Sequence, residues 1–194
     1  MEKNIFCENS IGLLILAGGR SRRMGIDKGS LKIDGETFVK RLLNNMGEYN
    51  EKIISAKGKG CADDAIILPD EDFLAGKGPA AGIVTALSYC KSSSLMVVAC
   101  DVPFADFSAA KKLADVYCGP PEALRKPVVA ESTRGIEPLV GIYPKSSEPV
   151  IRRALADGIY RVGDILKLTD YSAVRIEDEK LININTPEDY EKYE

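Results

Sequence analysis

A glycine pair surrounded by positive charge lies near the start of the chain, in the stretch LLILAGGRSRRMGIDK from Leu13 to Lys28. Ala17, Gly18 and Gly19 carry almost no side-chain bulk, so a phosphate oxygen can approach their backbone N–H groups directly. A charge run is usually only a solvated surface loop, but such a loop does not require two glycines directly after an apolar run. Anion binding is therefore favoured, and four nearby cations would serve it: Arg20, Arg22, Arg23 and Lys28.

A carboxylate, Asp101, follows the most apolar segment of the chain, LMVVA from Leu95 to Ala99, after one intervening cysteine. Where a buried parallel strand emerges from a sheet, the first charged side chain is held rigidly and is partly desolvated. This position suits a ligand of Mg²⁺, which accepts one or two protein ligands and keeps several waters. The alternative is that Asp101 is the N-cap of the following helix.

The chain contains no histidine, which removes the usual general base and the usual catalytic triad. Phosphoryl and nucleotidyl transfer both fit this composition, because an attacking phosphate monoester is already largely anionic near neutral pH and needs no base to activate it. Such a reaction requires charge neutralisation and in-line alignment. A metal ion on Asp101 that bridges the α-phosphate, with Lys28 and Arg23 on the triphosphate, would supply both.

The overall composition is that of a globular protein, and its length of 194 residues predicts a single domain over residues 1–194. A net charge of −3 argues against broad nucleic-acid binding, which requires a basic face. No segment approaches the apolar length of a membrane span. Five cysteines without a C-x-x-C pair predict neither a disulfide framework nor a zinc site. We therefore expect a cytoplasmic protein that contacts neither nucleic acid nor membrane.

Short apolar runs alternate with segments of helical period, which predicts an α/β fold. We expect a three-layer, doubly wound domain with a mostly parallel sheet and helices on both faces. Carboxyl ends of parallel strands share one edge of a sheet, so the glycine loop and Asp101 should face the same ligand. Strands are predicted at 13–16, 52–56, 65–68, 95–99, 127–130 and 139–143, and helices from 38 onward and at 79–89, 108–117, 148–156 and 160–168.

Several motifs resemble those of MobA-type nucleotidyltransferases, in the same order along the chain. LAGGRSRRMGIDK resembles the signature L-A-G-G-x-S-x-R-M-G-x-D-K. The segment from Asp70 to Gly82 resembles the second motif, D-x₇-G-P-x-A-G, which usually has leucine at the position of Ala80. The tetrapeptide C-D-x-P at residues 100–103 is similar to the family's magnesium-binding motif, and N-x-N-T-P-E-D from Asn183 to Asp189 is similar to its C-terminal motif.

The resemblance implies a Rossmann-like nucleotidyltransferase that transfers GMP from GTP to the phosphate of molybdopterin with Mg²⁺. Pyrophosphate leaves, and the guanine dinucleotide form of the molybdenum cofactor results. The implied nucleotide-binding residues are Leu16, Ala17, Gly18, Gly19, Arg23, Lys28, Ser55, Asp70, Gly78 and Asp101. Among them, Lys28, Arg23 and Asp101 are the implied catalytic residues, and Asp101 and Asn185 the metal ligands. Asn183, Glu137 and Arg134 are assigned to the acceptor side, although Arg134 and Glu137 could equally be loop surface.

Base choice is expected to depend on Asp70, which follows the third predicted strand. Its carboxylate can accept hydrogen bonds from the N1–H and N2–H₂ groups of guanine, a pattern that adenine and cytosine do not offer. Ser55 stands where the family often has asparagine. The alternatives are a CTP-dependent cofactor cytidylyltransferase, a sugar-phosphate nucleotidyltransferase, and a nucleotide-binding protein without turnover. Partner proteins would be those that deliver or receive the cofactor.

Overall fold

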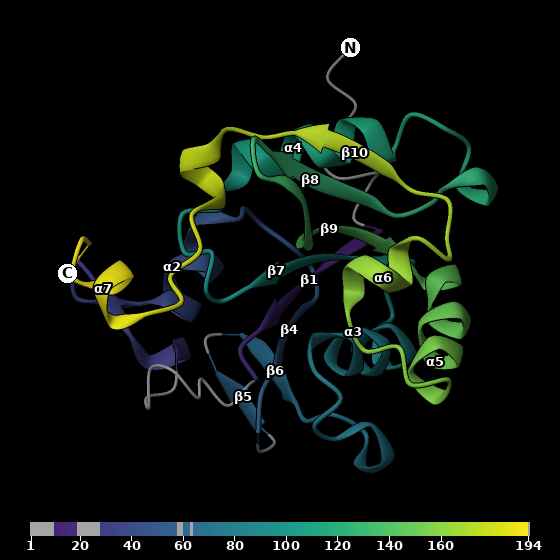
Figure 1. Ribbon diagram of the computed structural model, residues 1–194, viewed down its shortest axis with the longest axis horizontal. Helices are drawn as coiled ribbons and strands as arrows, with labels where there is room; N and C mark the ends of the chain where they lie inside the picture. Colours follow the sequence, from purple (N-terminus) through teal and green to yellow (C-terminus); the bar gives the residue numbers. More distant parts are fainter. Residues whose placement is uncertain (1–9, 19–27, 58–59, 63, 194) are drawn as a thin grey trace.

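The structure is a computed structural model that describes residues 10–18, 28–57, 60–62 and 64–193, without the side chains of residues 28 and 60–62. Within this part, eight strands form one sheet in the spatial order β10-β8-β9-β7-β1-β4-β6-β5 (Figure 1). The strands are β1 (Ile11–Leu16), β4 (Lys52–Ser55), β5 (Gly60–Ala62), β6 (Ala65–Leu68), β7 (Ser94–Ala99), β8 (Val128–Ser132), β9 (Gly135–Pro144) and β10 (Ser172–Arg175).

Six of the eight strands run in the same direction. The neighbours β1–β4, β1–β7, β4–β6 and β10–β8 are parallel, whereas β9 and β5 are antiparallel to the strands beside them. The prediction of a mostly parallel sheet is therefore confirmed.

Helices cover both faces of the sheet. Along the central strand β1, Leu13 and Ile15 join one core cluster, whereas Leu14 and Leu16 join the other, because successive side chains of a strand point to opposite faces. Residues of α2 (Phe38–Asn45) and α4 (Phe107–Tyr117) belong to the first cluster, and residues of α3 (Pro79–Tyr89), α5 (Glu148–Ala156) and α6 (Val162–Leu166) to the second (Figure 1). This arrangement confirms the predicted three-layer α/β fold.

The chain order creates a switch point between β1 and β7. From β1 the chain proceeds to β4 and β6 on one side, and then crosses to β7 on the other side. In open α/β sheets, ligands bind at the carboxyl ends of the strands where the order reverses. The register pairs Leu16 with Ala99, so both strands end at the same level.

The sheet beyond β7 differs from the prediction. The polar sequence ESTRGIEP is expected to connect two strands, but it belongs to a hairpin in which β8 reaches Ser132 and β9 begins at Gly135. An antiparallel pair can keep polar side chains on its solvated face. Its strands therefore do not appear as continuous apolar runs in the sequence. The short strands β5 and β10 are also additions to the predicted elements, because three or four residues are too few for a clear alternation.

A third, smaller core cluster joins the C-terminal segment to the region after the glycine loop. It contains Leu31, Ile33, Phe38 and Ile184, with Tyr190 packed against it. The short helix α7 (Pro187–Tyr190) has a capping box between Thr186 and Asp189. Its last residue, Tyr190, places its hydroxyl 2.7 Å from the carbonyl oxygen of Lys32 and 3.3 Å from its nitrogen. Lys32 belongs to the hairpin of β2 (Lys32–Ile33) and β3 (Glu36–Thr37).

Gly82 allows helix α3 to pack closely on the carboxyl ends of β1 and β4. A Cβ atom at this position would lie 2.6 Å from Oγ of Ser55 and 3.0 Å from Cδ2 of Leu16. Each of these two residues is only 6% exposed, so the added methyl group would clash with tightly packed core side chains. The glycine is therefore required by the close approach of α3 to these two strand ends.

We expect Gly82→Ala to lower the free energy of unfolding by about 1 kcal/mol. Overpacking costs about 1–3 kcal/mol, which exceeds the gain of about 1 kcal/mol that alanine has over glycine inside a helix. Urea denaturation measures the difference. Gly163→Ala in α6 is the control, because its added Cβ would be 3.5 Å from Cγ of Pro138, an ordinary contact. A Gly82→Ala protein as stable as this control would contradict the prediction.

The cysteine expectation requires a correction. Cys118, which follows α4, is disulfide-bonded, although the odd number of cysteines and the missing C-x-x-C pair predict no disulfide framework.

Among the helices that the structure describes, none combines the length and the apolar character needed to cross a membrane. The predicted cytoplasmic location stays a prediction.

Candidate active site

The glycine loop and Asp101 leave the sheet from adjacent strands. The N–H of Cys100 donates to the carbonyl oxygen of Leu16 at 3.0 Å, which continues the β1–β7 ladder by one residue beyond β7. Gly18 and Asp101 therefore emerge from neighbouring strands at the switch point of the sheet. The prediction that β1 and β7 end at the same edge of the sheet is confirmed by this geometry, whereas anion binding by the glycine loop stays a prediction.

One of the backbone N–H groups predicted to bind phosphate, that of Ala17, is already hydrogen-bonded within the sheet. The N–H of Ala17 donates to the carbonyl oxygen of Ser55 at 2.9 Å, and the Leu16 side chain is buried against α3. The Ala17 amide is therefore not oriented toward a ligand, and amides that hold a phosphate would begin at the exposed Gly18. This corrects the expectation that Ala17 contributes its amide.

Of three residues predicted to bind phosphate, two lie outside the described residues and the third is described by its backbone alone. Gly19 and Arg23 lie outside the described residues. Lys28 begins a short 3-10 helix, η1 (Lys28–Ser30), and its side chain is not among those described. Their assigned roles stay predictions.

Asp101 is not the N-cap of the following helix. That position belongs to Asp106, whose carboxylate accepts a hydrogen bond from the N–H of Ala109 at 3.0 Å and faces Nζ of Lys180 at 2.5 Å. Asp101 is half-buried and lies five residues before the cap. The alternative that competed with a ligand role is thereby removed.

The C-terminal segment brings two asparagines beside Asp101. The N–H of Ile184 donates to the backbone oxygen of Asp101 at 2.8 Å, and Ile184 is fully buried. Asn183 and Asn185 flank it on either side and are half-buried. The structure thus brings together the two parts of the chain that the sequence assigns to the metal, although 83 positions separate Asp101 from Ile184.

The residue types at this edge fit a hard divalent cation. The carboxylate of Asp101 and the side-chain amide of Asn185, on the adjoining segment, carry oxygen atoms of the kind that suits Mg²⁺. No group of three or more His, Cys, Asp or Glu side chains that could hold a metal occurs among the described residues. This is compatible with Mg²⁺, because that ion keeps most of its waters and takes only one or two carboxylates.

Asp70 lies at the end of β6, beside the end of β4. The side-chain hydroxyl of Ser55 hydrogen-bonds the Asp70 carboxyl group, and burial raises the pKa of Asp70 while this bond partly offsets the increase. Because Ser55 is 6% exposed, its hydroxyl supports Asp70 from inside the protein. The predicted direct contact of Ser55 with a nucleotide stays a prediction.

The two acidic residues that follow Asp70 are engaged differently. Glu71 forms an ion pair with Arg152 of α5, and the exposed Asp72 begins the 3-10 helix η2 (Asp72–Leu74). Of the three acidic residues in the sequence PDED, Asp70 is the one supported by Ser55 at the sheet edge. This supports its selection as the residue that contacts a base.

Arg134 and Glu137 belong to the β8–β9 hairpin and contact each other. Nη2 of Arg134 lies 3.3 Å from Oε1 of Glu137 and donates to the carbonyl oxygen of Leu181 at 2.7 Å. Asn183 Nδ2 approaches the same carbonyl oxygen at 3.3 Å. The three residues assigned to the acceptor side are thus brought together. Arg134 lies in the exposed turn of the hairpin, in agreement with the loop-surface alternative, whereas Glu137 belongs to β9 and is half-buried.

A cleft of about 470 Å³ begins at Gly78 and continues across β9 to the start of α6. Gly78 is the N-cap of α3 and has a φ of 79°, which favours glycine. The far side of the cleft carries Tyr160 and Arg161, both exposed. Neither residue lies in a sequence motif, and the only local signal for them is their position after the turn at Asp157 and Gly158.

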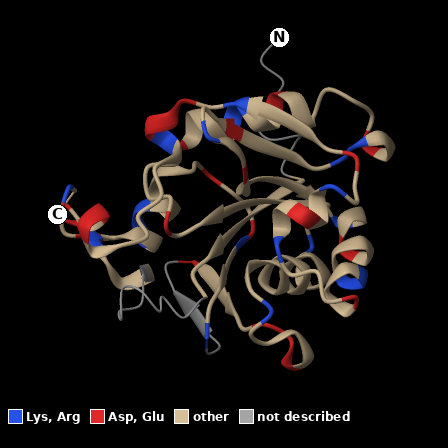
Figure 2. Ribbon diagram, viewed as in Figure 1, with Lys and Arg blue, Asp and Glu red and all other residues tan. Residues whose placement is uncertain are grey.

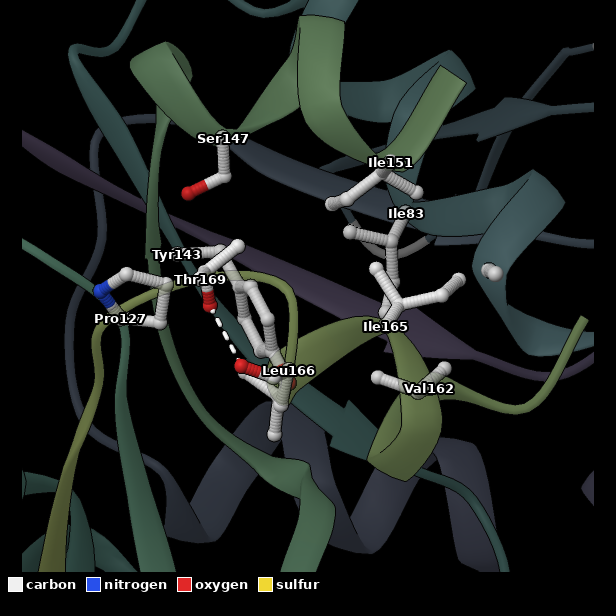
Figure 3. A pocket seen from close by; sticks show the side chains of 10 residues that line it. Ile83, Pro127, Tyr143, Ser147, Ile151, Val162, Ile165, Leu166 and Thr169 are labelled. Atoms are coloured by element: carbon white, nitrogen blue, oxygen red, sulfur yellow. Dashed lines mark hydrogen bonds between the residues drawn. The ribbon is translucent and has the colours of Figure 1, made fainter. Parts of the chain in front are cut away.

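A second cavity lies in the core between α3, α5 and α6, and its volume is only about 10 Å³. Figure 3 shows its lining, which is mainly apolar; the hydroxyl of Thr169 donates to the carbonyl oxygen of Leu166 at 2.9 Å. Ala80, where the MobA-type motif usually has leucine, also lines it. With this volume the cavity is a packing gap that is too small for a nucleotide.

The model of the MobA-like NTP transferase domain matches residues 13–173, which is most of the chain. This chain belongs to the MobA-like NTP transferase family. It is accordingly a nucleotidyltransferase by family, and the match contains the glycine loop, Asp70, Gly78 and Asp101.

Individual MobA-like relatives agree with this result. A Carboxydothermus hydrogenoformans protein named "Probable molybdenum cofactor guanylyltransferase" is 29% identical over 94% of this chain and 94% of its own length. The crystal structure of molybdopterin-guanine dinucleotide biosynthesis protein A from Archaeoglobus fulgidus matches with a TM-score of 0.76 and 23% identity, over 94% of this chain and 96% of that one. A Mycobacterium tuberculosis protein crystallised with manganese shares the fold, with a TM-score of 0.68, 16% identity and coverage of 94% and 97%.

Proposed function

We propose that this chain transfers GMP from GTP to the terminal phosphate of molybdopterin and releases pyrophosphate, with Mg²⁺ as the metal. The observation that carries the proposal is the meeting of Gly18, Asp101 and the segment 183–185 at one switch point of the sheet. An anion-binding loop and a cation-binding carboxylate at one edge fit a substrate that carries a triphosphate and a metal ion. The relative named as a guanylyltransferase supports the choice of GTP and molybdopterin.

The residues of the chain have distinct roles in this reaction. The amides from Gly18 onward, with Arg23 and Lys28, bind the triphosphate, and Asp70 accepts hydrogen bonds from guanine. Asp101 holds the divalent ion with Asn185 beside it. When bound, the ion supplies positive charge to the α-phosphate. An oxygen of the acceptor phosphate forms the new bond to the α-phosphorus as the bond to the pyrophosphate oxygen breaks.

The acceptor enters from the side of β9. The cleft between Gly78 and Arg161 has space for the acceptor, and the exposed Arg161 supplies a positive charge near Gly78, one of the implied nucleotide-binding residues. Arg134 and Glu137 lie on the β8–β9 hairpin, and Asn183 lies on the C-terminal segment. Because the attacking phosphate is already anionic, these residues need only bind and align it. The absence of histidine from the chain is compatible with such a reaction.

The decisive experiment measures pyrophosphate release from each nucleoside triphosphate, with and without molybdopterin, in the presence of Mg²⁺. We expect release that requires both GTP and molybdopterin. Preference for CTP would indicate the cofactor cytidylyltransferase, and release that requires a sugar 1-phosphate would indicate a sugar nucleotidyltransferase. Tight GTP binding without pyrophosphate release under any condition would indicate a nucleotide-binding protein without turnover.

A further inference from the structure

Arg152 occupies the centre of an interaction network between α5 and the segment after β6. Its Nη1 and Nη2 atoms each lie 2.9 Å from one carboxylate oxygen of Glu71, which is a bidentate ion pair. Nη2 also lies 2.9 Å from Oγ of Ser88, and Nε contacts Glu148 one turn earlier in α5. Figure 2 shows basic and acidic residues together on α5.

The same network extends to both sides of Glu71. The guanidinium of Arg152 stacks over the ring of Phe73 at 5.5 Å from its centroid, and the N–H of Glu71 donates to the hydroxyl of Thr85 in α3 at 3.2 Å. Glu71 is therefore fixed through its side chain by α5 and through its backbone by α3. Phe73 is 62% exposed, so the stacking is a surface contact that core packing does not require.

This ion pair differs from ordinary surface pairs. Exposed pairs contribute little on average, but bidentate arginine–carboxylate geometry and participation in a network are the circumstances in which they matter. The Arg152 and Glu71 side chains are 33% and 29% exposed, and the hydrogen bonds from Arg152 lower the pKa of Glu71. Glu71 is thus ionised and held in one geometry across the neutral pH range.

Asp70 is the residue directly before Glu71, and its own carboxylate is bonded only by the Ser55 hydroxyl among the contacts described. Accurate acceptance of two hydrogen bonds from a base requires the backbone of Asp70 to be fixed. We propose that Arg152 is a positioning residue for base selection, which acts by clamping Glu71 so that Asp70 is presented to the N1–H and N2–H₂ groups of guanine. This inference rests on the proposed function, and specifically on guanine recognition by Asp70.

The test compares GTP with ITP, which keeps the N1–H of the base but lacks the 2-amino group. We expect Arg152→Met to raise KM for GTP about tenfold, to change kcat less than about twofold, and to reduce the GTP-over-ITP preference in kcat/KM. Arg152→Lys keeps the charge without the fork and should show a similar loss, because lysine cannot form the bidentate pair. Glu71→Gln weakens the same pair from the other side.

The matched control is Arg153→Met, the same substitution one residue further along α5. The Arg153 side chain is 78% exposed and pairs with Asp157 on its own helix, so base selection should be unchanged. A second measurement, hydrogen–deuterium exchange of the amides at 70–74, should show faster exchange in Arg152→Met than in Arg153→Met.

The outcomes separate this inference from the proposed function. If the wild-type protein prefers GTP over ITP and Asp70→Asn removes the preference, but Arg152→Met retains it, the clamp is overturned. Unchanged exchange at 70–74 in Arg152→Met also overturns it. If the wild-type protein shows no preference, or Asp70→Asn leaves it intact, guanine recognition by Asp70 is wrong, and the role of Arg152 in base selection is rejected with it.

Discussion

Replacing Asp101 with asparagine is expected to reduce kcat for pyrophosphate release by about a thousandfold or more while leaving the melting temperature unchanged. The substitution keeps the shape of the side chain but removes the charge that holds the divalent ion, and loss of such electrostatic stabilisation typically costs a factor of about 10²–10³ or more. The backbone contact with Ile184 involves the main-chain oxygen of Asp101, which the substitution does not alter.

The measurement is pyrophosphate release against Mg²⁺ concentration, together with a thermal melting curve. Asp106→Asn is the control, because Asp106 caps α4 and asparagine caps a helix about as well as aspartate. That variant should keep its activity and lose only the stability that the ion pair between Asp106 and Lys180 contributes. An Asp101→Asn enzyme with unchanged magnesium dependence would reject the metal role.

Lys28→Ala is expected to lower kcat about a hundredfold or more and to weaken GTP binding much less. A lysine against the reacting phosphates stabilises the charge of the transition state more than that of the bound substrate, so turnover is affected before affinity. Steady-state kinetics give kcat, and equilibrium binding of GTP gives the affinity.

Lys32→Ala is the matched control, since Lys32 is an exposed lysine of β2 close to Lys28 in the sequence. It should retain near-normal turnover. Equal activity of the two variants would show that Lys28 is not a catalytic residue. A protein that binds nucleotide without turnover would instead lose affinity in Lys28→Ala and have no turnover to lose.

The sheet around the site was readily predictable because its strands are apolar on both faces. LLIL, AIIL and LMVVA are continuous apolar runs that begin after Gly12, Asp64 and Ser94, so their positions follow from the sequence alone. The hairpin at Ser132–Gly135 was not predicted, because its side chains are partly solvated and carry no clear period. The engagement of the Ala17 amide by Ser55 is also invisible in the sequence, since it depends on the register of β1 and β4.

The side-chain contacts of the site were less predictable than its strands. Arg152 and Glu71 are 81 positions apart, and neither lies in a motif that relates one to the other. Two aspartates, at positions 101 and 106, could each cap the helix after β7, and only the backbone geometry assigns the cap to Asp106. Local patterns predict which residues reach an edge of the sheet, whereas tertiary packing decides which of them meet.

The contacts of the C-terminal segment have a consequence for how the protein becomes active during synthesis. Ile184 bonds the backbone of Asp101, and Tyr190 bonds that of Lys32, shortly after η1. Because chains are made from the N-terminus and early elements fold first, Lys32 and Asp101 are translated long before the segment that contacts them. A nascent chain that lacks residues 184–190 lacks these two backbone contacts. We therefore expect full nucleotidyl transfer activity only after this segment has left the ribosome and docked.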